Sequence, residues 1–209
     1  MQNNTLYVTL GLIVLLALIL SGIQPYDRAT WLLEVSPVLL AAPVLLATHH
    51  RFPLSRLLYI LVAFHALVLI LGGAYTYARV PLGFWVQDLF DLQRNPYDKL
   101  GHFMQGLVPM LLTREILLRR RYLTPGAMLN FLGICVALAI SAFYELIEWW
   151  VALIAGGGAT DFLGTQGDPW DTQSDMLLAL LGASAVLLGI DRLQDRQITA
   201  LKTHSKSEG

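Results

Sequence analysis

Residues 6–23 read LYVTLGLIVLLALILSGI, without a charged side chain. Residues 57–78, LLYILVAFHALVLILGGAYTYA, form a second uncharged stretch. A helix of roughly 20 mostly apolar residues is long enough to cross the hydrocarbon of a bilayer. The first stretch lacks the basic start of a signal peptide, because residues 1–26 contain no Lys or Arg. Both stretches therefore predict membrane-spanning helices.

The rest of the chain repeats this pattern with a few charges added. Four more stretches qualify or nearly qualify as spans: residues 31–48, 99–118, 126–154 and 175–190. We therefore predict an all-α polytopic membrane helical bundle with about six transmembrane helices. Residues 1–190 are expected to form a single six-span domain, and residues 191–209 a polar cytoplasmic tail.

The composition supports a membrane protein. Of the 209 residues, 56% are hydrophobic and 14% are charged, and the mean hydropathy is +0.57. A soluble domain has about 25% charged residues, enough to cover a surface that faces water. The single cysteine, Cys135, excludes a disulfide framework and a Cys-rich metal site. A net charge of −1 gives no reason to expect nucleic acid, so the expected partner is the lipid bilayer.

Six spans place successive loops on alternating sides of the membrane. The side that holds both termini carries Arg51, Arg56, Arg119, Arg120, Arg121, Arg192, Arg196, Lys202 and Lys206. The other side carries only Arg28, Arg79, Arg94 and Lys99. Cytoplasmic loops are the ones enriched in Lys and Arg, so both termini are predicted to be cytoplasmic. The small residues Gly101, Gly106, Gly182 and Gly189 are candidates for close helix packing, within one chain or between chains, and set no oligomeric state.

Acidic residues gather on the opposite, outer side. Glu145 lies 19 residues into the stretch 126–154, about 28 Å along a helix that starts at the cytoplasmic face. Asp98 and His102 are spaced i,i+4 and share a helix face, as Glu145 and Glu148 do at i,i+3. The ends of the last three spans therefore bring together His102 and six acids: Asp98, Glu145, Glu148, Asp168, Asp171 and Asp175.

One imidazole among several carboxylates suits a divalent metal ion such as zinc, manganese, magnesium or calcium. The predicted ligands are His102, Glu145, Asp168, Asp171 and Asp175. Glu148 and Glu145 are the predicted catalytic residues, with Glu148 as the general base toward a metal-activated water. The predicted substrate-binding residues are Arg94, Tyr97, Asp98, Gln105, Gln166 and Trp170, and the loop 159–173 is expected to close over the site.

Three functions are compatible with this pattern. The first is a metal-dependent hydrolase that acts on a lipid or lipid-linked envelope substrate at the outer leaflet. The second is a transporter or flippase whose carboxylates carry protons or cations, although no broken helix pair or inverted repeat is visible in the sequence. The third is a non-catalytic scaffold in which the acids cap helices or pair with Arg79 or Arg94. His65, in the middle of the third span, is interpreted as a satisfied core residue rather than a ligand, and transport would need it, with Arg114 and Glu115, to continue a path to the cytoplasmic face.

Four blocks of sequence resemble the YjdF-type bacterial inner-membrane proteins. They are GAYTYARVPLG at residues 73–83, RNPYDKLGH at 94–102 with Gln105, Gly106, Arg114 and Glu115, YELIEWW at 144–150, and FLGTQGDPWDTQSDM at 162–176. The resemblance implies a multi-pass protein of the bacterial inner (plasma) membrane and no particular reaction. The last three spans are also similar to VanZ-like membrane proteins, which implies a role in the cell envelope. The loop TQGDPWD at residues 165–171 departs from the VanZ-like pattern.

Overall fold

The structure is a computed structural model and describes residues 4–155 and 165–207. Parts of the predicted loop 159–173, domain 1–190 and tail 191–209 thus lie outside the described residues. The helices are α1 (Asn4–Ile23), α2 (Arg28–Thr48), α3 (Arg56–Tyr75), α4 (Pro81–Phe90), α5 (Tyr97–Arg119), α6 (Ala127–Ala155), α8 (Asp171–Ala185), the 3₁₀ turn η2 (Val186–Leu188) and α9 (Ile190–Ser207). The part of the chain that the structure describes contains no strand, as the all-α prediction requires.

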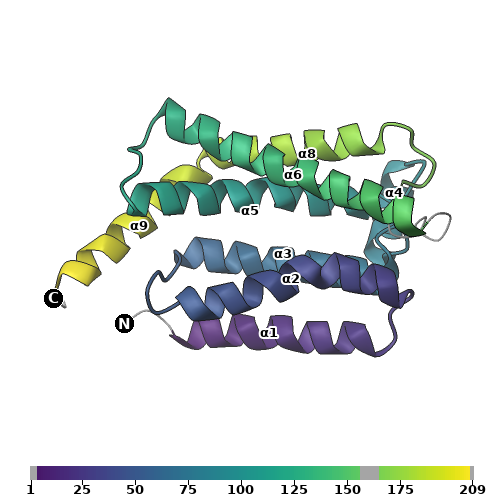
Figure 1. The fold of residues 1–209 in the computed structure, drawn as a ribbon, viewed down its shortest axis with the longest axis horizontal. Coiled ribbons are helices and arrows are strands. Elements are labelled where there is room, and N and C mark those ends of the chain that lie inside the picture. The colour runs from purple at the N-terminus through teal and green to yellow at the C-terminus, as the bar shows by residue number, and fades with distance from the viewer. Residues whose placement is uncertain (1–3, 156–164, 208–209) are drawn as a thin grey trace.

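The long helices α1, α2, α3, α5, α6 and α8 run along one common direction (Figure 1). Helices α1, α2 and α3 pack on one another, and α5 packs on α6 and α8. The two groups meet where α3 packs on α5. Both chain ends lie at the same end of the bundle in Figure 1, as an even number of spans requires.

The lengths and compositions of these helices fit a bilayer. Four of them, α1, α2, α3 and α6, are long and apolar enough to span a membrane, and α8 with α9 forms a fifth candidate that is bent by 63°. The remaining predicted span, residues 99–118, corresponds to α5, which carries charged residues at both ends and packs on α3, α6 and α8. Large apolar side chains of α1 face outward, such as Leu12 and Leu16, which are 59% and 57% exposed. Such side chains are expected to contact lipid.

Two glycines set the distance between α5 and α8. A Cβ atom on Gly106 would lie 1.8 Å from the carbonyl oxygen of Ala179, and one on Gly182 would lie 1.9 Å from that of Phe103. Close backbone contact of this kind is how membrane helices associate in the absence of a strong hydrophobic drive. The predicted packing role is confirmed for these two positions.

Gly189 has a different role, because it lies at the bend between η2 and α9 with φ +127°, and no atom lies within 4 Å of a Cβ placed there. After this bend α9 leaves the direction of the bundle (Figure 1). Its first half is nevertheless packed, since Gln194 is fully buried and Ile198 is 3% exposed. Gln197 accepts a 2.8 Å hydrogen bond from the backbone N–H of Leu57.

The loop between α3 and α5 contains a short helix, α4, that the sequence analysis did not identify. Pro81 occupies its first turn, a position where the missing N–H costs no hydrogen bond. Trp85, Leu89 and Phe90 are exposed on it by 73%, 76% and 66%. In Figure 1, α4 lies at the end of the bundle opposite the termini, where such side chains suit the membrane interface.

Candidate functional site

Four helices bring acidic side chains to the end of the bundle opposite the termini. We call this group the carboxylate end and define it by Glu34 of α2, Asp98 and His102 of α5, Glu145 and Glu148 of α6, and Asp175 of α8. The first turn of α5, the last third of α6 and the first turns of α8 lie side by side here because these helices run in alternating directions.

His102 occupies the centre of the carboxylate end and is 6% exposed. Its Nε2 atom lies 3.5 Å from Asp98 Oδ1 and 3.8 Å from Asp175 Oδ2. Both separations exceed the 2.7–3.2 Å or so of a normal N–H···O hydrogen bond. Two ligand atoms each about 2.1 Å from one metal ion lie about 3.4 Å apart at a tetrahedral angle. The two separations are those of ion pairs with a protonated imidazole, and they also approach the spacing of ligand atoms around one ion.

The other ring nitrogen of His102 is held by a neighbour. Nδ1 lies 3.0 Å from Oε1 of Gln105, an atom that can only accept a hydrogen bond. Nδ1 therefore donates to Gln105, and Nε2 on the opposite side of the ring faces Asp98 and Asp175. Metal-binding histidines commonly donate their second N–H to such an acceptor, which fixes the ring and its tautomer.

Two carboxylate oxygens of the carboxylate end are buried without a partner. Glu145 Oε1 and Asp175 Oδ1 form no hydrogen bond among the described residues, although their residues are only 8% and 2% exposed. A buried acceptor without a partner costs about 1–3 kcal/mol, and more when it is charged. Two groups of possible ligand atoms share His102: those of Asp98, His102 and Asp175 lie within 4.8 Å of one another, as do those of His102, Glu145 and Glu148.

Arg94 engages two of the predicted metal ligands instead. Its Nη1 atom lies 2.5 Å from Asp171 Oδ1 and 2.8 Å from the carbonyl oxygen of Thr165, and its Nη2 atom lies 2.8 Å from Asp168 Oδ2. Burial lowers the pKa of the Arg94 guanidinium, but the hydrogen bond and charge of Asp171 outweigh it and leave that pKa raised. The structure thus gives Asp168 and Asp171 a common partner in the guanidinium rather than a place beside His102.

The remaining predicted substrate-binding residues mostly hold the loop and helix ends in place. The side chain of Gln166 forms two hydrogen bonds of 3.1 and 3.0 Å with the backbone N–H and carbonyl of Asn95. The Tyr97 hydroxyl donates to the carbonyl oxygen of Val68, and this tyrosine is 5% exposed. Trp170 is 65% exposed at the start of α8. Among the predicted binding residues, Asp98 and Gln105 are the ones that line the cavity described next.

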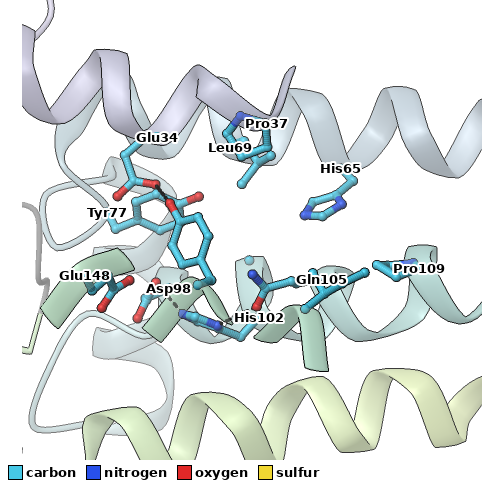
Figure 2. A pocket seen from close by; sticks show the side chains of 13 residues that line it. Glu34, Pro37, His65, Leu69, Tyr77, Asp98, His102, Gln105, Pro109 and Glu148 are labelled. Carbon is cyan, nitrogen blue, oxygen red and sulfur yellow. Dashed lines mark hydrogen bonds and ion pairs between the residues drawn. The ribbon is translucent and has the colours of Figure 1, made fainter. Parts of the chain in front are cut away.

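A cavity of about 210 Å³ opens beside His102 between α2, α3, α5 and α6. A single water needs roughly 10–15 Å³ by the same measure, so there is room for a chemical group of several heavy atoms. Glu34, Asp98 and Glu148 line one part of it, and Pro37, Leu69 and Ile140 line another. Figure 2 shows the carboxylates of Glu34, Asp98 and Glu148 gathered on one side of this space.

Two residues on the cavity wall were missed by the sequence analysis as site residues. Glu34 is 4% exposed, and its Oε2 atom accepts a 3.0 Å hydrogen bond from the Tyr144 hydroxyl. Tyr77 is 6% exposed, and its ring fills the space left by two glycines, with a Cβ on Gly72 placed 2.4 Å from it. An acid inside an otherwise apolar span was the available signal for Glu34. Tyr77 carried no such signal.

His65 lies on the wall of the same cavity, further from the carboxylates (Figure 2). Its Nε2 atom is buried and forms no hydrogen bond among the described residues. The interpretation of His65 as a satisfied core residue therefore does not describe this nitrogen. Gln105 lies between His65 and His102 in Figure 2.

Comparison with known proteins places the chain in a family. Residues 6–196 match a family model described as "Predicted membrane protein (DUF2238)". The inner membrane protein YjdF of Escherichia coli (strain K12) is 58% identical over 195 residues, which cover 93% of this chain and 91% of that protein. No solved structure matches the chain. The resemblance to YjdF-type proteins is thus confirmed, and this multi-pass inner-membrane protein belongs to the DUF2238 family of predicted membrane proteins.

Proposed function

We propose that the protein is a metal-dependent hydrolase of a lipid or lipid-linked envelope substrate, with its metal held by Asp98, His102 and Asp175. The observation that carries this proposal is the 3.5 and 3.8 Å spacing between His102 Nε2 and the two aspartates. The Gln105 contact on the opposite ring nitrogen supports a ring whose Nε2 faces the two aspartates. The unpartnered oxygen of Asp175 supports a missing ligand rather than a closed hydrogen-bond network.

The donor set favours zinc or manganese within the predicted group of metals. Magnesium and calcium prefer oxygen ligands, whereas an imidazole nitrogen with carboxylate oxygens suits borderline ions. When bound, such an ion supplies Lewis acidity at the reacting centre. Glu148 offers a carboxylate oxygen within 4.8 Å of a His102 ligand atom. Its carboxylate is therefore placed to take a proton from an attacking water.

The cavity supports an amphiphilic substrate. Its polar part adjoins the ligand set, and its apolar part is lined by Pro37, Leu69, Pro109 and Ile140. Helices α2 and α6 border it from the two halves of the bundle, joined across it by the hydrogen bond from Tyr144 to Glu34. An acyl or polyprenyl chain could extend along the apolar side while its headgroup meets His102.

The test is hydrolysis by purified protein in proteoliposomes that contain labelled phospholipid or polyprenyl phosphate. We expect turnover that requires zinc or manganese, stops with chelator, and is lost in Asp175→Asn. The exposed acid Asp88 of α4 provides the control, and Asp88→Asn should retain full activity. Turnover equal in wild type and Asp175→Asn, or unchanged by chelator, contradicts the proposal.

The proposal places the carboxylate end on the outer face of the membrane and both termini in the cytoplasm. The excess of Lys and Arg near the termini supports this orientation. A fluorescent protein fused to the C-terminus should then fold and fluoresce, and alkaline phosphatase at the same site should be inactive. The opposite pair of results would reverse the orientation and move the substrate to the inner leaflet.

Proton- or cation-coupled transport is a second candidate, favoured by the unpartnered His65 inside the cavity. A pathway to the other membrane face would have to cross the apolar cluster that includes Met104, Leu107, Met110 and Leu111 of α5. That cluster is why we rank transport second. Substrate-driven proton uptake into proteoliposomes, sensitive to His65→Leu, would reverse the order.

A further inference from the structure

The cavity is lined by more acidic side chains than the proposed metal site uses. Besides the proposed ligand Asp98, Glu34 and Glu148 line it, and Glu145 lies beside them in the carboxylate end. The described residues that line the cavity include no Lys or Arg. The nearby cation Arg94 is already paired with Asp168 and Asp171. A buried carboxylate in a membrane protein is expected to have a cationic or hydrogen-bonding partner.

Three of these acids lack a cationic partner from Lys or Arg among the described residues. Glu148 lies beside His102 and Glu145. Glu145 Oε1 is buried without a hydrogen bond, 3.9 Å from His102 Nδ1. Glu34 has a single described hydrogen-bond partner, the neutral hydroxyl of Tyr144. A divalent ion at Asp98 and Asp175 would leave this second set of acids without a cation of its own.

Aromatic rings complete this part of the cavity. Tyr77 and Tyr144 both line it together with Glu34 and Glu148. Figure 2 shows the Tyr77 ring beside the Glu34 carboxylate. Aromatic faces next to acids are the surroundings that bind ammonium groups, through cation–π attraction and charge pairing, and the attraction is strongest where water is excluded. A hydrated metal ion gains less from such rings than an organic cation does.

We propose that the cavity binds an amphiphile with an ammonium headgroup, held between Glu34 and Glu148 and against the rings of Tyr77 and Tyr144. This inference names the substrate class of the proposed hydrolase and depends on that function only for the neighbouring metal. The apolar residues Pro37, Leu69 and Ile140 then contact the chain of the amphiphile. The buried Nε2 of His65 is available to a polar group between headgroup and chain.

The test is calorimetric titration of the full-length protein, purified in dodecyl maltoside, with four probes. Decyltrimethylammonium and decanol compare a cationic and a neutral amphiphile. Choline and 3,3-dimethylbutanol compare a free cation with its uncharged isostere. We expect decyltrimethylammonium to bind at least tenfold more tightly than decanol. Choline binding of equal strength would assign the site to a free ammonium compound rather than a lipid, with the cationic site itself upheld.

Substitutions of Glu34 and Glu148 test whether the cation binds between these two residues. Glu34→Gln and Glu148→Gln should each weaken decyltrimethylammonium binding at least tenfold, while the control Asp88→Asn binds as wild type. Equal binding of the cation and its neutral isostere, or wild-type affinity in both glutamine variants, overturns the inference. Metal content measured on the same samples separates the two proposals. A protein that binds the cation through Glu34 without binding metal upholds this site and rejects the metal-dependent function.

Discussion

The two ends of α5 carry polar networks of opposite character. At the end near the termini, Glu115 is fully buried and each of its oxygens has a partner. Oε1 accepts from the backbone N–H of Ser55 at 2.7 Å and from Arg119 at 3.0 Å, and Oε2 lies 3.4 Å from Nε2 of Gln194. We call this group, with Arg114 and Asp195, the arginine end.

Charge is balanced in the arginine end and unbalanced in the carboxylate end. Arg114 binds Asn130 at 2.5 Å and both carboxylate oxygens of Asp195 at 3.2 and 3.4 Å. In the carboxylate end, by contrast, distances from the acids to His102 are 3.5–3.9 Å. Both ends contain buried atoms without a hydrogen bond, but these are Ser55 Oγ, Arg114 Nε and Gln194 Oε1 in the arginine end and the carboxylate oxygens Glu145 Oε1 and Asp175 Oδ1 in the carboxylate end. A network whose acids are all paired holds helices together, whereas one with excess acid is poised to receive a ligand. The exposed fractions of the side chains alone do not distinguish the arginine end from the carboxylate end.

The largest loss of stability is expected when Glu115, the central acid of the arginine end, is removed. Glu115→Ala should cost about 3–5 kcal/mol, because it leaves the buried backbone N–H of Ser55 without its acceptor and removes the carboxylate that pairs with Arg119. Unfolding by SDS in mixed micelles measures the loss, with the exposed Asp88→Ala as control. A loss no larger than that of the control would show that the arginine end does not stabilise the fold.

The second largest loss of stability is expected at the contact between α5 and α8. Gly106→Ala and Gly182→Ala should each cost about 1–3 kcal/mol, since the new Cβ meets a backbone carbonyl of the facing helix. Gly11→Ala in α1 is the matched control, because no atom lies within 4 Å of a Cβ there. Equal stability of all three variants would mean that α5 and α8 are further apart than described.

The smallest expected effect is in the carboxylate end, and its sign is opposite. In chelator, Glu145→Gln should leave the free energy of unfolding unchanged or raise it by about 1 kcal/mol, because the substitution relieves crowding among buried acids while Oε1 gives up only a 3.9 Å contact with His102. The same SDS unfolding measurement applies. A loss comparable to that of Glu115→Ala would assign Glu145 a structural role and favour the scaffold hypothesis.

Much of the fold could be predicted from the sequence because the bilayer imposes a length and polarity on each span. The stretch 126–154 corresponds closely to α6, and 57–78 to α3, at Ala127–Ala155 and Arg56–Tyr75. The last predicted span, 175–190, starts about one turn after α8 does, at Asp171. The charged residues at the beginning of α8 made its start difficult to recognise in the sequence. The sequence did not predict that the first half of α9 packs on the bundle, because its buried residues Gln194 and Ile198 do not belong to a strong periodic apolar pattern.

The gathering of Asp98, Glu145, Glu148 and Asp175 around His102 could be predicted, because the alternation of spans brings the ends of α5, α6 and α8 to one face. Asp98 and His102 face one another because i,i+4 spacing requires it. The partners of Arg94 lie more than 70 residues away, so the sequence could not show that Asp168 and Asp171 pair with its guanidinium. Glu34 did carry a signal as an acid in an apolar span, but its contact with Tyr144, 110 positions further along the chain, could not be predicted.

The central claim is that the excess acid beside His102 receives a metal ion. Its most direct test is elemental analysis of protein purified without chelator after supply of zinc and manganese, comparing wild type, Asp175→Asn and Asp88→Asn as equally monodisperse samples. The account predicts a stoichiometric ion in wild type and Asp88→Asn and its loss in Asp175→Asn. Wild type without bound metal, or Asp175→Asn with the full amount, would contradict it.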